Sequence, residues 1–147
     1  MLVKFGAAGA LLIALTCSAA AQGMCGDPPI APMIPSPADM RNKPAADAEA
    51  ARNAAFQDIR RWQGALKSYR ACLVATVDTD KRNIGEVARS DKPDKDKIAS
   101  LQKEITASNA AYDSSVDDEE RVVNQWNAAG TAYCLRSGVD HATCPKT

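Results

Sequence analysis

The sequence predicts an all-α protein: a long antiparallel two-helix hairpin, coiled-coil-like and disulfide-bridged, with an extended Pro-rich N-terminal arm. Apolar residues recur at alternating steps of three and four in two long stretches, which is the period of coiled coils. A single break at residues 90–94 separates these stretches, so the two helices should run antiparallel. Six prolines crowd the region 28–44, where a regular helix is therefore not expected.

Residues 1–21 have the layout of a cleavable signal peptide. Lys4 is followed by an apolar run at 5–15 and then by small residues that end at Ala21. This order of charged, apolar and small-residue segments is typical of secretory signals. The apolar run is shorter than the roughly 20 residues that cross a bilayer, so no membrane span is expected after cleavage. The sequence therefore predicts a periplasmic or secreted protein.

The cysteines support the same location. Cys17 lies within the leader and is a candidate for lipidation, although Leu15 and Thr16 before it match a lipoprotein signal only in part. Four cysteines remain after cleavage, and an even number in an oxidising compartment indicates two disulfides. The predicted disulfide residues are Cys25, Cys72, Cys134 and Cys144.

Residues 22–43 form the predicted Pro-rich extended arm. Proline fixes φ and lacks a backbone donor, so this stretch favours polyproline II, with one turn near Ser36 and Pro37. Two interpretations stay open. The arm is either a recognition segment for a partner, or a tether that begins at Cys25 and lies on the helical domain.

The helical hairpin is predicted over residues 44–138, with helices at about 44–89 and 93–137 and a C-terminal tail at 139–147. Pro44 suits a first helical turn, and Gly138 suits the position just after a helix. The first helix carries a stripe that weakens in its middle: Ala55, Ile59, Trp62, Leu66, Tyr69, Leu73, Thr76, Asp80, Ile84 and Val87. The second helix carries Ile98, Leu101, Ile105, Ser108, Tyr112, Ser115, Val116, Glu119, Val122, Trp126, Ala129 and Tyr133.

The two stripes fit one register. If the chain turns at Asp91, the numbers of facing residues add up to about 185. Leu73 then faces Tyr112, and Ile59 faces Trp126. Weak layers meet for part of the length, because Thr76 lies opposite Ser108, whereas Asp80 lies near Ile105. This match predicts the hairpin more strongly than either stripe alone.

Glu119 is the polar exception within the second stripe. It should face Leu66, where a carboxylate is unfavourable unless it reaches solvent or a cation, and Lys67 and Arg70 are the candidate cations. Polar residues at such positions often set the oligomeric state. The sequence therefore leaves two alternatives: a homodimer of two hairpins in a four-helix arrangement, or a monomer that its own arm covers.

The register also favours one pairing of the cysteines. In a straight hairpin Cys72 and Cys134 lie about 20 helical residues apart, on the order of 30 Å, far beyond disulfide reach. The arm is long enough to bring Cys25 to Cys72, and the chain can turn back so that Cys144 meets Cys134. A Cys72–Cys134 bond would instead require a third helix, made by a bend near Asp78.

Three groups of residues invite a chemical interpretation. His141 lies between Cys134 and Cys144, but two thiolates and one imidazole are one ligand short of a closed zinc site. The segment 78–80 lacks the glycine and final carboxylate of a calcium loop, so a solvated helix surface is expected there. The carboxylates of the acidic run 117–120 cannot converge on one atom, because adjacent side chains on a helix point in different directions. We therefore expect a solvated, ion-paired face there. No catalytic, cofactor-binding or metal-ligating residues are assigned.

Charge and motifs narrow the function. Removing Lys4 from 18 basic residues leaves 17 against 18 acidic ones, so nucleic acid is not an expected partner. No G-x-S-x-G elbow, phosphate loop or H-E-x-x-H motif occurs, and we do not expect an enzyme. The main hypothesis is an exported non-catalytic module that binds an unknown protein or itself. The alternative is a small ligand or metal binder that uses the Cys/His-bearing C-terminus.

Overall fold

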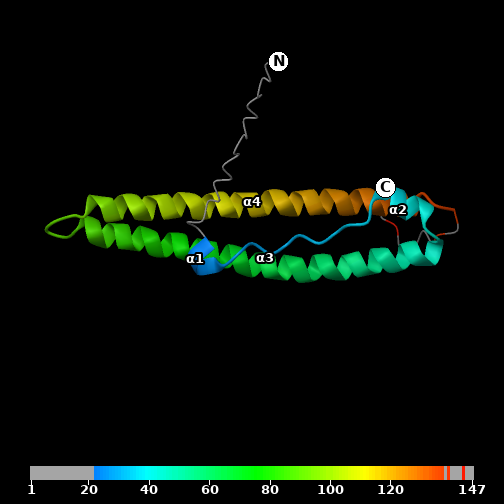
Figure 1. Ribbon diagram of the computed structural model, residues 1–147, viewed down its shortest axis with the longest axis horizontal. Coiled ribbons are helices and arrows are strands. Elements are labelled where there is room, and N and C mark those ends of the chain that lie inside the picture. Colours follow the sequence, from blue (N-terminus) through cyan, green and yellow to red (C-terminus); the bar gives the residue numbers. More distant parts are fainter. Residues whose placement is uncertain (1–21, 138, 140–143, 145–147) are drawn as a thin grey trace, which may run out of the picture.

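The structure is a computed structural model, and it describes residues 22–137, 139 and 144. The predicted signal peptide at 1–21, Gly138, His141 and most of the C-terminal tail lie outside the described residues. In the described part the chain is helical, without strands, and two long helices lie side by side (Figure 1). The elements in chain order are α1 (Gln22–Cys25), α2 (Pro37–Asn42), α3 (Ala45–Ala88) and α4 (Lys95–Cys134).

Helix α3 is the longest element, about 66 Å at 1.5 Å per residue. Pro44 precedes it as N-cap, and Asp47 places a negative charge in its first turn, where the macrodipole favours it. It ends at Ala88, within one residue of the expected position. The buried side chains follow the predicted stripe: Ala48, Ala55, Ile59, Trp62, Leu66, Leu73, Val77 and Asp80.

The reversal between the long helices is short. Asp94 is the N-cap of α4, and its carboxylate accepts a hydrogen bond of 3.0 Å from the backbone amide of Lys97. Polar contacts across the hairpin verify the register. Arg70 Nε donates to Ser115 Oγ at 2.8 Å, and Gln63 Nε2 donates to Glu119 Oε1 at 3.2 Å. The all-α hairpin with the predicted register is therefore confirmed.

Helix α4 ends at Cys134, earlier than the expected residue 137. Leu135 is the C-cap, and its amide donates back to the carbonyls of Thr131 and Tyr133. Arg136, expected in the last turn, lies beyond the helix and donates to the carbonyls of Met40 and Lys43, both at 2.5 Å. These carbonyls at the end of α2 lack partners within that short helix, so they attract the guanidinium.

The arm at residues 22–43 is non-helical in its middle and has a short helix near each end, the second of which begins at the turn expected near Ser36 and Pro37. Residues 26–36 have no helix, but α1 and α2 bracket them. Ser36 begins α2 with a capping box: its Oγ accepts from the amide of Asp39 at 3.1 Å, while the Asp39 carboxylate accepts from the Ser36 amide at 3.2 Å. Pro37 then occupies the first helical position, where its missing donor is harmless.

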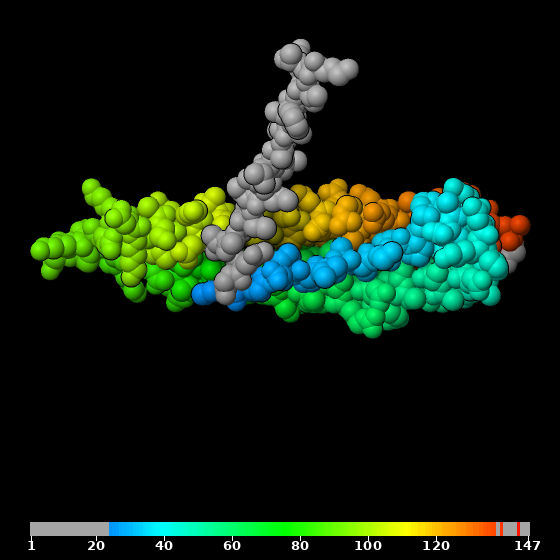
Figure 2. All heavy atoms as spheres, viewed as in Figure 1, coloured from blue at the N-terminus to red at the C-terminus, as the bar shows by residue number. Residues whose placement is uncertain are grey.

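The arm lies along the groove between α3 and α4 (Figure 2). Trp62 Nε1 donates to the Pro29 carbonyl at 3.1 Å. Ala31 and Ile34 pack on a buried cluster that both long helices supply: Ile59, Trp62, Leu66 and Val122. Of the two interpretations of the arm, the structure has the one in which it lies on the helical domain.

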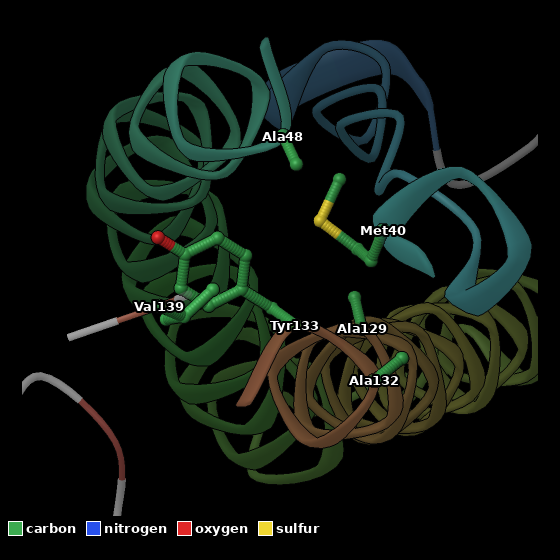
Figure 3. Packing of buried hydrophobic residues seen from close by; sticks show 6 residues of the cluster. All are labelled: Met40, Ala48, Ala129, Ala132, Tyr133 and Val139. Carbon is green, nitrogen blue, oxygen red and sulfur yellow. The ribbon is translucent and has the colours of Figure 1, made fainter. Parts of the chain in front are cut away.

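Helix α2 closes the end of the hairpin where α3 begins and α4 ends. Met40 is fully buried, and Figure 3 shows it pointing from α2 into the space between Ala48 and Ala129. Burying a side chain of this size stabilises the fold by about 1.5 to 3 kcal/mol. The small side chains allow close approach, so the Ala-rich surface binds α2. The cluster comprises Met40, Ala48, Ala129, Ala132, Tyr133 and Val139.

Two disulfides fasten the chain to this frame. Cys25 is bonded to Cys72 with a Cα–Cα distance of 5.7 Å, and Cys134 to Cys144 with 5.8 Å. These are the two pairs that the hairpin register favours. None of the described helices combines the length and apolar character that crossing a lipid bilayer requires.

Candidate functional site

The arm divides the hairpin into two unlike sides. On one side Cys72 holds Cys25, and Thr76 Oγ1 lies 3.6 Å from the Cys25 sulfur. A helix turns by about 100° per residue, so Val74, two residues after Cys72, lies on the opposite side of α3. Val74 is 49% exposed. We call this opposite side of the α3–α4 pair the open face.

Large apolar side chains are partly exposed along the open face. On α4 they follow a heptad spacing. Val116 and Val123 are seven residues apart, and Glu119 is seven residues from both Tyr112 and Trp126. This second stripe runs beside the buried one, because the positions that flank the core positions of a helix also recur every seven residues. The exposed members of the open face are Phe56, Val74, Tyr112, Val116 and Val123.

Two members of the open face were expected in the core. Tyr112 is 36% exposed and Val116 is 42% exposed, whereas Ser115 between them is buried. The facing residue explains this: Arg70 bonds Ser115 through both its side-chain oxygen and its backbone carbonyl, at 2.8 and 2.7 Å. The guanidinium occupies the space that an apolar side chain would fill, so Tyr112 and Val116 lie outside it.

Arg70 and Glu119 form the polar centre of the open face. Arg70 Nη1 lies 2.5 Å from Glu119 Oε2, and their side chains are 18% and 31% exposed. Gln63 donates to the second carboxylate oxygen, and the guanidinium also lies 5.7 Å from the centre of the Tyr112 ring. Of the two candidate cations for Glu119, Arg70 is the one that pairs with it, and Lys67 is exposed.

Cations and aromatic rings alternate at the end of the open face where α3 begins and α4 ends. Arg52 lies over the rings of Trp126 and Tyr133, at 5.6 and 5.1 Å from their centres. Phe56 contacts Trp126 at 5.9 Å, and Arg60 lies over Phe56 at the same distance. Such cation–π contacts hold flat side chains in one orientation. They leave Phe56 43% exposed as a fixed apolar edge.

Next to Val74 the open face has a shallow hollow of about 220 Å³. This volume is below the roughly 300 to 1,000 Å³ of typical small-molecule sites. It has room for one or two side chains. The lining residues come from both long helices: Leu73, Val74, Val77, Asp78, Lys81, Ser108, Asn109 and Tyr112.

Asp80 corrects the expectation that residues 78–80 form a solvated surface. Its side chain is buried between the long helices, with the residue 6% exposed, and one carboxylate oxygen has no hydrogen-bond partner. Burial raises the pKa of Asp80, and the nearby negative charge of Glu104 raises it further. The described residues contain no group of three or more side chains that could hold a metal ion.

The two other groups that the sequence offered as candidate sites are the C-terminal cysteines and the acidic run, and neither forms a binding site in the described residues. Cys134 and Cys144 are bonded to each other, so neither offers a thiolate to a metal. In the acidic run 117–120, which was expected to form an ion-paired face, Asp118 accepts a hydrogen bond from Arg121 at 2.8 Å. Both partners are about half exposed, so this pair is a weak surface contact.

No protein-family model, curated protein or solved structure matches the chain. The sequence reading missed the open face because it assigned each helix a single stripe and placed Tyr112 and Val116 within it. The signal that separates the two was present: Tyr112, Glu119 and Trp126 repeat at seven residues in parallel with the buried Ser108, Ser115 and Val122.

Proposed function

We propose that this protein is exported and works as a non-catalytic binding module, with the open face as its protein-binding surface. The observation that carries the proposal is the contrast between the two sides of the hairpin. The arm covers one side, while the other leaves large apolar side chains from both helices partly exposed around the Arg70–Glu119 pair. Apolar surface gathered on one side of a small protein commonly marks an interaction site.

The fixed geometry of the open face supports binding. Its arginines orient the aromatic rings, and its central charges are already paired, so a partner meets a preorganised surface. The hydrogen-bonding groups of Arg70, Ser115 and Glu119 are engaged with one another. This mutual engagement supports a structural rather than a catalytic role for them. The hollow beside Val74 accommodates side chains of a docked helix.

Export rests on the leader and the disulfides. Residues 1–21 have the signal layout, and the two disulfides suit the periplasm or the extracellular medium, where thiols oxidise. An intact mass of protein recovered outside the cytoplasm tests this directly. We expect a chain that begins near Gln22. Its mass should be lower by four hydrogen atoms than that of the reduced chain, because two disulfides have formed. A retained leader or an acyl chain would contradict the proposal.

Site-specific photo-crosslinking in the cell envelope tests the binding surface. A photoreactive residue at Val123, on the open face, should form adducts with a bound protein, whether another chain or a second copy. The matched control is Asn124, the next residue, which is exposed but rotated by about 100° toward the outer side of α4. Adducts at both positions, or at neither, would contradict the open face as the specific binding surface.

A further inference from the structure

The open face is built equally by both long helices. Phe56, Gln63, Arg70 and Val77 repeat at seven residues on α3, and Tyr112, Glu119 and Trp126 do so on α4. Side chains of the two helices meet at the same levels, as the Phe56–Trp126 and Arg70–Glu119 contacts demonstrate. A second hairpin laid on this face, level with the first, therefore meets the same sequence of apolar and polar layers.

The two edges of the open face carry opposite charge. Arg60 and Lys67 precede Val74 by fourteen and seven residues, so they line up with it along the α3 edge. Glu120 lies one turn after Val116, and Asp113 lies seven residues before Glu120, so both border the α4 edge. These four side chains are exposed. The face is thus basic along α3 and acidic along α4.

We propose that the partner of the open face is a second copy of this chain, which deepens the proposed function and rests on it. The two hairpins are related by a twofold axis parallel to their length. This axis places α3 of each copy over α4 of the other at the same level. Lys67 then lies beside Glu120 of the second copy, and Val74 packs on Tyr112 of the second copy.

Charge selects this arrangement over its alternative. A twofold axis perpendicular to the helices would instead place α3 over α3 and bring the basic edges together. Like charges placed opposite each other in an interface are unfavourable, whereas the parallel axis pairs each basic edge with an acidic one. The same patch serves both copies, as a twofold interface requires. The product is a four-helix bundle with Arg70 and Glu119 of both copies in one central layer.

The size of the face is sufficient. From the level of Phe56 to that of Lys81 is about 25 residues of helix, or about 38 Å at 1.5 Å per residue. Two adjacent helices are about 20 Å wide. The footprint is therefore roughly 700 to 800 Å² per copy, which matches the contribution of one partner to a standard stable interface.

Sedimentation equilibrium of the mature, oxidised protein from roughly 1 to 100 μM tests the proposal, a range that covers micromolar dissociation constants. We expect twice the mass of one chain. Lys67→Glu and Glu120→Lys should each weaken the dimer about tenfold or more, because each places like charges together. The two changes in one chain should restore the dimer. Lys103→Glu, the same charge change on an exposed part of α4 away from the open face, should leave it unchanged.

Restoration by the double variant identifies the contact as intermolecular, because Lys67 and Glu120 lie on opposite edges of one hairpin. Circular dichroism of each variant establishes that it is folded. A dimer that neither charge change weakens, or that the double variant does not restore, overturns the proposed arrangement. A monomer at every concentration overturns the second copy as partner. In that case crosslinks from Val123 to a different protein leave the proposed function standing, and their absence removes it too.

Discussion

Removal of the Cys25–Cys72 disulfide should destabilise the protein more than removal of Cys134–Cys144. The first bond joins residues 47 positions apart and the second joins residues 10 apart. A longer closed loop restricts the unfolded chain more. The chain-entropy relation gives about 4 kcal/mol for the first bond and about 2.7 kcal/mol for the second at 25 °C. We therefore expect a difference of about 1.3 kcal/mol between the two pairs of substitutions.

The perturbations are Cys25→Ser with Cys72→Ser, and Cys134→Ser with Cys144→Ser as the matched control. Urea unfolding followed by circular dichroism measures the free energy of unfolding for each. Because the arm packs against Trp62, fluorescence of the first variant also reports whether the arm has lifted from the helices. If the second variant is the less stable one, the loop-length reasoning is wrong, and local packing at each bridge decides stability instead.

Three further predictions concern single side chains. Glu119→Leu should lower the free energy of unfolding by about 1.5 to 3 kcal/mol, because Arg70 loses its carboxylate partner in a mostly buried position; an unchanged urea midpoint would contradict this. The raised pKa of Asp80 means that this carboxyl binds its proton more tightly in the folded protein than in the unfolded chain, so the contribution of Asp80 to stability should rise as the pH falls from 7 toward the unfolded value of 3.8. Asp80→Asn should stabilise the protein at pH 7 and remove this residue's contribution to the rise, as unfolding at pH 7 and at lower pH would reveal. Trp62→Phe should lose the bond to Pro29, about 1 kcal/mol, and hydrogen exchange in the arm should become faster without loss of the hairpin.

The hairpin could be predicted from the sequence because its signal is long and redundant. Each stripe extends over about nine to ten turns, and the two stripes line up along one register. This register excluded a Cys72–Cys134 bond by distance, and the reach of the arm then favoured the pairing that the structure has. Leu73 and Leu66 are 2% exposed, in agreement with their central places in the stripe. A periodic pattern that extends over many residues predicts a helix even where single positions depart from it.

The elements that the sequence did not reveal depend on single tertiary contacts. Helix α2 has only six residues, too few for a periodic pattern, and the burial of Met40 requires the Ala surface of both long helices. Arg136 leaves α4 because distant carbonyls at the end of α2 accept its hydrogen bonds. Asp80 is buried although one of its carboxylate oxygens has no hydrogen-bond partner, which is unfavourable for a carboxylate. In each case the partner is far away in sequence, so local patterns contain no information about it.

In the proposed function, the two sides of the hairpin have separate roles in stability and in binding. Two helices alone bury only one stripe each, which is too little for a stable small domain. The arm adds a third layer on one side through a disulfide, the Trp62 hydrogen bond and Met40, and these contacts do not depend on a partner. The open face is then available for a partner, and its exposed edge can vary without unfolding the protein. Substitutions on the arm side should therefore change the free energy of unfolding of the monomer, whereas charge changes at Lys67 or Glu120 should change association and leave that free energy unchanged.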